Sequence, residues 1–386
     1  MKERIRVVHL ITTLELGGAQ LNTLYTYENL DVEKFSAYLI SGPGGILIPK
    51  EEKRDHFIIC EKLERFVHPL HDLQALLRLK RILIRLNPHI VHTHSSKAGI
   101  LGRLAARSAK IPVLIHSVHG FSFAPSQPFW QRNLYLFCEK TIAPLTTHFI
   151  FVSEDDARVA RGHRLISDNY SLIRSGFPLK KFAVAGANNR AVRSRFGIGE
   201  NGTVCGVIAP FKPQKGLFHL IDIAERVLKE KPDTIFFVAG DGNMRPAIEK
   251  EIRRKGMEAN FRLPGFVADI ENAIDIFDIG VSTSLWEGLP QSLVQMRLKK
   301  KPVVASDIPG NREIVRNGRN GFLVDVADHS RFSRRIIDLI ERRNMRERLA
   351  HCPDEDFSEW DAERMVRKQE ALYESLWKRC RPSDDR

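Results

Sequence analysis

Short apolar runs alternate with amphipathic runs along most of the chain. Residues 5–12 are apolar on both faces, which is typical of a buried parallel strand, and a helical pattern follows to about Leu30. The same alternation recurs in the second half, beginning with the apolar run 204–208. Repeated alternation of this kind predicts an α/β protein with two doubly wound, parallel sheets.

The domain boundaries are predicted from length and from one break in composition. A chain of 386 residues is too long for one ordinary core and suits two domains. The break is the run AGANNRAVRSR, which begins shortly after Pro178 and is interpreted as a linker. We therefore expect a Rossmann-like N-terminal domain over 1–178, a Rossmann-like C-terminal domain over 190–356, and a last helix over 357–380. That helix carries one apolar stripe, formed by Met365, Val366, Leu372, Tyr373, Leu376 and Trp377.

Composition narrows the class of protein. A hydrophobic content of 43% with 28% charged residues is typical of a soluble globular protein, and no run of 18 apolar residues predicts a membrane-spanning helix. The N-terminus places His9 and Glu15 where a signal peptide would be apolar, so a first strand is predicted there. The five cysteines (60, 138, 205, 352 and 380) form no Cys-x-x-Cys pair. They indicate reduced thiols in the cytoplasm, with neither a disulfide framework nor a zinc site.

Residues 281–298, VSTSLWEGLPQSLVQMRL, combine a strand end, a polar loop and a helix start. Pro290 suits the first turn of the helix, because its missing N–H would have had no partner there. Glu287 precedes that helix, and Gln295 lies more than a turn inside it, roughly 10 Å away at ~1.5 Å per residue. The free N–H groups near Gly288 to Ser292 form an anion site suited to a diphosphate. Taken alone, Glu287 would be interpreted as a solvated loop acid.

Three glycine-containing turns also follow predicted strands. Gly17-Gly18 lets backbone approach a phosphate closely, although a plain strand-to-helix turn would have the same sequence. The turn departs from Gly-x-Gly-x-x-Gly, which disfavours NAD binding. Lys215-Gly216 precedes a helix and is a candidate phosphate contact, and Gly240-Asp241-Gly242 makes another glycine loop.

These segments together resemble a known family. Glu287, seven residues and then Gln295 is similar to the donor-site signature of the retaining family-4 glycosyltransferases of GT-B fold, in which the second residue is also Glu. The runs HTHSSKAGILGRLAAR (92–107) and HSVHGFSF (116–123) resemble the branch of that family that makes bacterial surface polysaccharides. The resemblance extends over nearly the whole chain. It implies a GT-B fold whose last helix crosses back to pack on the N-terminal domain.

The resemblance also implies roles for particular residues. His119 would face the sugar of the nucleotide-sugar, Glu287 would hold sugar hydroxyls, and Lys215 would hold the diphosphate. Gln295 would bind the ribose, with one charge-assisted bond fewer than a carboxylate provides. The other expected contacts to the nucleotide-sugar are Gly17, Gly18, Lys212, Gly240, Gly242, Phe266, Gly288, Leu289 and Pro290.

Several of these assignments have plain structural alternatives. Lys212 either replaces the charge of a family arginine, whose position is Pro210 here, or is a solvated loop cation. Phe266 either stacks on the nucleobase or packs in the core, and core packing is the expected fate of its ring. His119 could be a structural histidine, and His92, His94 and His116 are expected to be structural or to lie on the acceptor side.

No metal or cofactor is predicted. His92-x-His94 could in principle ligate zinc, but no acid or third histidine has a suitable spacing in the sequence. An Asp-x-Asp motif between two strands is also missing from the sequence. The family resemblance therefore implies a metal-independent enzyme whose only co-substrate is a nucleotide-sugar, expected to be UDP-linked.

Two functions from different classes remain. The first is a retaining transfer of a sugar from a UDP-sugar to a lipid-linked saccharide during cell-surface polysaccharide synthesis. The second is a catalytically weak or inactive GT-B subunit that binds or scaffolds within a polysaccharide assembly, since Pro210 and Gln295 depart from the family pattern. A GT-B sugar-nucleotide epimerase lacks support, because those enzymes carry different acids.

The net charge of +13 indicates an anionic partner. No nucleic-acid module is present, so an anionic membrane surface and the nucleotide-sugar are the expected partners. The run 73–86 predicts a helix with Arg78, Arg81 and Arg85 on one face and more apolar surface than packing on a sheet requires. The helix could dock the protein on the inner face of the cell membrane. It could also be a core helix with a solvated arginine face.

Overall fold

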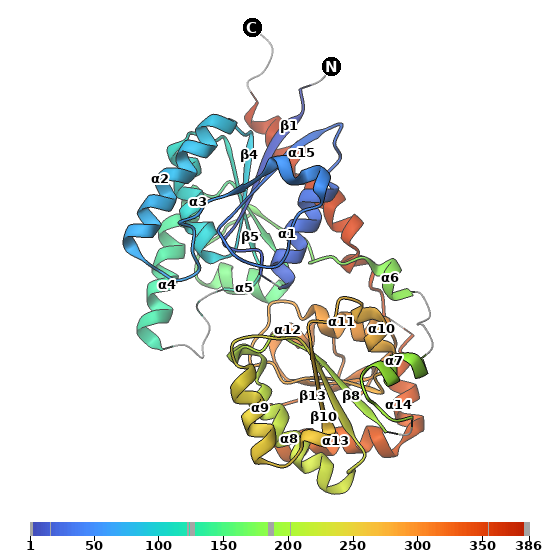
Figure 1. Cartoon of the computed structure of the whole chain (residues 1–386). Helices are drawn as coiled ribbons and strands as arrows, with labels where there is room; N and C mark the ends of the chain where they lie inside the picture. The colour runs from blue at the N-terminus through green and yellow to red at the C-terminus, as the bar shows by residue number, and fades with distance from the viewer. Residues whose placement is uncertain are drawn as a thin grey trace. The chain divides into compact units, whose positions relative to one another are not determined.

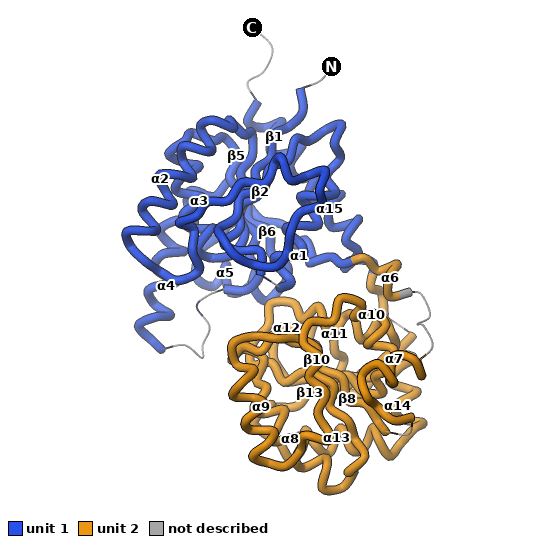
Figure 2. Tube along the Cα trace, in the orientation of Figure 1, with its two compact units in different colours: residues 1–177, 358–386 blue, residues 178–357 orange. Residues whose placement is uncertain are grey.

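The computed structural model describes residues 3–15, 17–121, 123, 128–183, 189–200, 202–353 and 355–381. The chain divides into two compact units (Figure 2). Unit 1 comprises residues 1–177 and 358–386, and unit 2 comprises residues 178–357. Part of the run interpreted as a linker is helical, because Asn189–Arg195 forms helix α7. Residues 184–188 lie outside the described part of the chain.

Unit 1 is built on a seven-stranded sheet in the order β3-β2-β1-β4-β5-β6-β7, and its described strand pairs are all parallel. Figure 1 labels β1, β4 and β5 of this sheet. The strands are β1 (Ile5–Ile11), β2 (Phe35–Ser41), β3 (Phe57–Ile59), β4 (Ile90–His94), β5 (Val113–Val118), β6 (His148–Phe151) and β7 (Tyr170–Leu172). The helices are α1 (Gly18–Asn29), α2 (Pro69–Leu86), α3 (Ser96–Ser108), α4 (Phe129–Ile142), α5 (Glu154–Gly162) and α15 (Ala362–Cys380).

Alternation along β1 sends neighbouring side chains to opposite faces of the sheet. Val7 joins a core with α1 and α15, whereas Val8 joins a core with α2 and α3. The expected apolar stripe on the last helix contributes Met365, Val366, Tyr373 and Leu376 to the first of these cores. The prediction that this helix returns to the N-terminal sheet is therefore confirmed.

Unit 2 is built on a six-stranded sheet in the order β10-β9-β8-β11-β12-β13, again with parallel pairs throughout its described strands. The strands are β8 (Val204–Ile208), β9 (Ile235–Ala239), β10 (Phe261–Gly265), β11 (Ile279–Ser282), β12 (Val303–Ser306) and β13 (Gly321–Val324). The helices are α6 (Leu179–Ala183), α7 (Asn189–Arg195), α8 (Leu217–Glu230), α9 (Arg245–Arg254), α10 (Ile270–Asp275), α11 (Gln291–Leu298), α12 (Pro309–Arg312), α13 (His329–Glu341) and α14 (Arg343–Ala350).

Both sheets reverse their order of winding at one point. The first and fourth strands of each unit are neighbours, β1 beside β4 in unit 1 and β8 beside β11 in unit 2. In open parallel sheets, ligands bind at the carboxyl ends of the strands beside this reversal, because the loops there separate. Two doubly wound sheets were predicted, and that fold is confirmed. Among the described residues, every helix is too short or too polar to cross a membrane.

Candidate functional site

In unit 2 the loops that follow β8 and β11 are held against each other. Lys215 ends a single 3₁₀ turn, Pro213–Lys215, and Gly216 has a positive φ of 58°. A Cβ on Gly216 would lie 2.2 Å from the carbonyl oxygen of Thr283, so the close approach of the two loops requires glycine. The Thr283 hydroxyl also donates a hydrogen bond of 3.0 Å to the carbonyl oxygen of Lys215. Lys215 is thereby fixed at the reversal of strand order.

Glu287 and Lys215 form an ion pair at this edge of the sheet. Their side chains are only 9% and 15% exposed, respectively. The Ser284 hydroxyl donates to the same carboxylate oxygen at 2.7 Å, and Nε2 of Gln214 lies 3.4 Å from the other. Glu287 is therefore a largely buried acid that contacts Lys215, Ser284 and Gln214. The alternative of a solvated loop acid is wrong, because the loop folds back on the end of β8.

Four residues that the sequence analysis did not single out support this pair. Gln214 also donates to the carbonyl oxygen of Trp286 at 2.8 Å, which holds the loop before Glu287. Ser284 is itself held, because the Ser306 hydroxyl bonds to its carbonyl oxygen. A Cβ on Gly310 would lie 2.6 Å from the carbonyl oxygen of Glu287, so this position has to stay free of a side chain. Because Gln214 is next to Lys215 in the sequence, its place in the site could have been predicted.

The helix after Glu287 begins without a side-chain cap. Pro290 is the N-cap residue of α11, and among the described residues no side-chain hydrogen bond caps that helix. An uncapped N-terminus presents N–H groups to an anion. Gln295 lies within this helix and is half-buried, and its side-chain amide has no hydrogen-bond partner among the described residues. Gly288 and Leu289 are half-buried in the loop between Glu287 and the helix.

The other predicted contacts in unit 2 are two glycines, one aromatic residue and one lysine. Cβ atoms on Gly240 and Gly242 would lie 2.0 and 2.6 Å from the carbonyl oxygens of Ala209 and Phe211, so both glycines have a packing role. Phe266 is 57% exposed. Its expected burial in the core is wrong, because it lies just past the end of β10, and its ring can meet a ligand. The Lys212 backbone N–H donates to the carbonyl oxygen of Pro210 at 2.8 Å.

In unit 1 the loop after β1 leads into α1. Gly17 is the N-cap residue of α1, in extended conformation, and no side chain in the described part of the chain caps this helix. A Cβ on Gly17 would meet only the flexible side chain of Gln20. Gly18 is the first helical residue. The amides at this helix start are therefore available to an anion, but packing of the described residues does not by itself require glycine at position 17.

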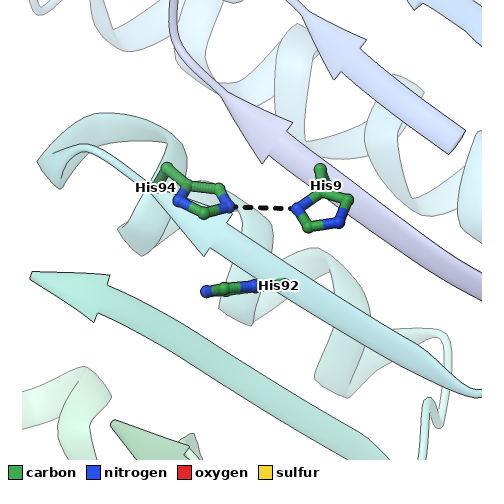
Figure 3. A group of neighbouring side chains, drawn as sticks. All are labelled: His9, His92 and His94. Carbon is green, nitrogen blue, oxygen red and sulfur yellow. Dashed lines mark hydrogen bonds between the residues drawn. The ribbon is translucent and has the colours of Figure 1, made fainter. Parts of the chain in front are cut away.

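His119 lies directly after β5 and belongs to a cluster of histidines on one face of the sheet. His9 of β1 is in register with His92 of β4, and His94 follows two residues later on the same face. Nδ1 of His9 lies 3.2 Å from Nε2 of His94, and Nδ1 of His94 lies 3.4 Å from Nε2 of His119. Figure 3 marks the contact between His9 and His94 with a dashed line. Burial lowers the pKa of His9 to about 3 and that of His119 to about 4.

Burial also holds the pKa values of His92, His94 and His116 well below the ordinary value for histidine. These rings are therefore neutral at neutral pH. The expectation that they are structural or lie on the acceptor side stays a prediction.

Three of these histidines have the spacing of a metal site. Ligand nitrogens of His9, His92 and His94 all lie within 4.8 Å of one another. The expectation that no third histidine joins the His92-x-His94 pair is wrong, because the pairing of β1 with β4 supplies His9. However, His92 already bonds to the Tyr373 hydroxyl at 2.6 Å and to the Ser117 hydroxyl at 2.7 Å. A metal would have to displace one of them, so metal independence stays our prediction.

Comparison with known proteins identifies the family. Residues 16–181 match the family described as Glycosyltransferase Family 4, and residues 188–351 match Glycosyl transferases group 1. A similar protein from Escherichia coli is UDP-Gal:alpha-D-GlcNAc-diphosphoundecaprenol alpha-1,3-galactosyltransferase, 27% identical over 374 residues, which cover 96% of this chain and 97% of that protein. Putative glycosyltransferase EpsD of Bacillus subtilis is 30% identical over 277 residues, 70% of this chain and 72% of that protein.

The fold is shared with solved structures. That of Anabaena Alr3699/HepE in complex with UDP and glucose has a TM-score of 0.81 at 19% sequence identity, covering 96% of this chain and 100% of that one. Sucrose-phosphate synthase from Thermosynechococcus elongatus has a TM-score of 0.79 at 16% identity, covering 97% and 100%. With two doubly wound sheets, each with polar residues at its reversal of strand order, the chain belongs to the family-4 glycosyltransferases of GT-B fold.

Proposed function

We propose that the protein transfers a sugar from a UDP-sugar to a lipid-linked saccharide in the synthesis of a bacterial surface polysaccharide, with retention of anomeric configuration. The carrying observation is the part-buried Lys215–Glu287 pair at the reversal of strand order in unit 2. The similarity to the E. coli galactosyltransferase, whose name specifies a UDP-linked donor and a diphosphoundecaprenol acceptor, supports both substrate classes. Unit 2 would bind the UDP-sugar, and unit 1 would bind the acceptor.

The ion pair gives donor binding a defined chemistry. In the absence of ligand, the carboxylate of Glu287 balances the positive charge of the Lys215 ammonium. A diphosphate beside Lys215 would compete for the ammonium and release the carboxylate to accept hydrogen bonds from sugar hydroxyls. Lys215 and the amides at the start of α11 would then stabilise charge that develops on the leaving phosphate.

The transfer itself needs no residue as a nucleophile. The bond between the sugar's anomeric carbon and the phosphate oxygen breaks as the bond to the acceptor oxygen forms on the same face. The acceptor hydroxyl passes its proton to the departing diphosphate. In this proposal His119 positions the sugar, and Glu287 and Lys215 act on the reacting groups.

The remaining predicted residues would complete the nucleotide-sugar site. Gln295 would bind the ribose, and Phe266 would stack on the nucleobase through its exposed ring. The backbone at Gly288, Leu289 and Pro290 would surround the diphosphate. Gly240 and Gly242 would shape the adjacent loop, Lys212 would add positive charge, and Gly17 and Gly18 would approach the phosphates or the acceptor from unit 1.

We also propose that unit 1 docks on an anionic membrane surface. Helix α2 buries Ala75, Leu79, Ile82 and Leu83 against the sheet. A second apolar row remains exposed beside the exposed Arg78, Arg81 and Arg85, formed by Leu70, Leu73, Leu77 and Ile84. An exposed apolar row beside clustered cations suits the boundary between headgroups and acyl chains.

Helix α4 adds to this surface. Phe129, Trp130, Leu134 and Phe137 are between 51% and 80% exposed, although each is large and apolar. Both α2 and α4 pack against α3, so they lie on the same side of the unit 1 sheet (Figure 1). Such a surface costs solubility unless something apolar covers it. A membrane that carries the lipid-linked acceptor would do so.

Activity can be tested by UDP release. Purified protein would be supplied with UDP-sugars and a lipid-linked saccharide, and turnover of at least one UDP-sugar is expected. Release of UDP only in the presence of acceptor would separate transfer from hydrolysis. Binding of UDP-sugars without turnover across the panel would favour the non-catalytic subunit instead.

Membrane docking can be tested by sedimentation with anionic liposomes. Binding should fall at high salt and fall again when Arg78, Arg81 and Arg85 are changed to Glu. A control with the same change in charge is available in unit 2, where Arg226, Lys229 and Arg331 line a groove between α8 and α13. An equal loss of binding in both triple variants would mean that net charge alone, and not α2, attracts the protein to lipid.

A further inference from the structure

Hydrogen bonds around His92 define where its proton lies. The Tyr373 hydroxyl donates to Oε1 of Gln369 at 3.1 Å. A hydroxyl has one proton, so its contact of 2.6 Å with His92 requires Nδ1 of His92 to be the donor. Nε2 of His92 therefore accepts from the Ser117 hydroxyl at 2.7 Å. Both nitrogens of His92 are satisfied by α15 and β5.

The other three histidines form a chain in which each proton position depends on the next. The chain runs from His9 through His94 to His119, with contacts of 3.2 and 3.4 Å. All three rings are neutral, so each carries one N–H and one bare nitrogen. Only two arrangements are consistent with both contacts. Either every N–H points toward His119, or every N–H points toward His9.

The inner end of the chain distinguishes the two arrangements. His9 is completely buried, and its Nε2 has no hydrogen-bond partner among the described residues. If every N–H pointed toward His9, this nitrogen would carry an orphaned N–H. If every N–H points toward His119, it is an unshared lone pair. Orphaned buried N–H groups are the rarer defect in native proteins, so the arrangement in which every N–H points toward His119 is favoured.

We propose that His9 and His94 are positioning residues that hold His119 as its Nδ1–H tautomer. His94 then donates to Nε2 of His119, and Nδ1 of His119 has no partner among the described residues. This nitrogen presents an N–H. Resting on the function proposed above, its partner would be an oxygen of the nucleotide-sugar, and it would not accept a hydrogen bond from a sugar hydroxyl.

The tautomer is measurable without any assay of activity. Protein with ¹⁵N-labelled histidine would be examined by NMR through the couplings between ring nitrogens and ring protons. The His119 signals would be assigned by their loss in His119→Gln. We expect Nδ1 of His119 to carry the proton in the unmodified protein near neutral pH. A proton on Nε2 would overturn the proposal.

Two variants of His94 sharpen this test. His94→Leu removes the hydrogen-bond donor, so His119 should change to the Nε2–H form that free imidazole prefers. His94→Asn keeps an amide N–H near the position of Nδ1 and should retain the Nδ1–H form. His148→Gln is the control, because His148 lies on β6, two strands from β4 in the sheet, and bonds to Ser171 on β7. Unchanged His119 signals in His94→Leu would contradict a positioning role.

Kinetics connect the tautomer with the reaction. In His94→Leu, kcat should fall about tenfold while KM for the acceptor stays constant, and His94→Asn should recover most of the loss. A changed tautomer with unchanged kcat would remove the link to catalysis. A protein without activity toward any UDP-sugar would refute the proposed function, whereas the NMR result on the tautomer would stand.

Discussion

The two units share one topology and use opposite chemistry at the same place in it. In each sheet the first and fourth strands are neighbours, and the polar residues gather at that point. Unit 1 places neutral, buried histidines there, on β1 and β4. Unit 2 places an ion pair on the loops that follow β8 and β11.

The contrast follows from where the side chains sit relative to the strand ends. His9, His92 and His94 lie within strands, where burial from helices on that face disfavours any charge. Lys215 and Glu287 lie in loops just past the strands, where a charged pair stays partly accessible. The same topology therefore positions neutral hydrogen-bonding side chains in unit 1. In unit 2 it positions an ion pair whose partners can bind a ligand instead of each other.

The largest expected difference between the units is their response to acid. The native pKa values of His9, His92, His94, His116 and His119 lie far below 6.5, so in unit 1 the unfolded chain binds protons that the native state does not. The free energy of unfolding should fall as the pH drops from about 6.5 toward 4, by up to about 1.4 kcal/mol per pH unit for each such histidine.

Asp156 has the opposite effect on the free energy of unfolding. Burial raises its pKa to about 6, so the native state binds a proton at this carboxyl at a higher pH than the unfolded chain does. One carboxyl does not offset five histidines. Hydrogen exchange measured by mass spectrometry between pH 7 and 5 should therefore show the sheet of unit 1 opening before that of unit 2. Simultaneous opening of both sheets would contradict this difference.

The second expected effect is on the charged pair in unit 2. Glu287→Gln should reduce turnover by about 10²- to 10³-fold, because Lys215 loses its counter-charge and the sugar loses a carboxylate acceptor. Glu258→Gln, at an exposed acid of the same unit, is the matched control. The measurement is UDP release, accompanied by thermal unfolding. Near-normal turnover in Glu287→Gln would refute the assignment of the site.

A smaller effect is expected at Gln295. Gln295→Ala should weaken UDP binding about tenfold and leave kcat nearly constant, because the amide bonds to the ribose in both ground and transition states. Gln295→Glu should bind as tightly as the unmodified protein or more tightly. Calorimetric titration with UDP measures both. Loss of all nucleotide binding in Gln295→Glu would place the ribose elsewhere.

The smallest expected effect is that of a chelator. Activity should be unchanged after EDTA treatment and dialysis, because the charge on the diphosphate is met by Lys215 and by helix amides. Elemental analysis of the purified protein should likewise find no stoichiometric zinc at the three histidines of unit 1. Loss of turnover on chelation, restored by Mg²⁺ or Mn²⁺, would contradict the role given to Lys215.

Local sequence was sufficient for much of the site in unit 2. Glu287, Pro290 and the helix that follows are consecutive in the chain, so their arrangement depends on turn and helix geometry alone. The two parallel sheets were likewise predictable, because the alternation of apolar and amphipathic runs indicates which elements are buried. The return of the last helix to unit 1 was implied by the family resemblance, and the apolar stripe on that helix agreed with it.

Only the tertiary structure decided which distant residues meet. His9 and His94 are 85 residues apart, and no spacing rule connects them, but parallel pairing of β1 with β4 places their rings in contact. The same holds for Glu287, whose burial depends on the loop after β8, and for Phe266, whose ring stays exposed. Register and loop packing are set by the whole core, so the protonation of His119 and the pairing of Lys215 were determined only when the sheets formed.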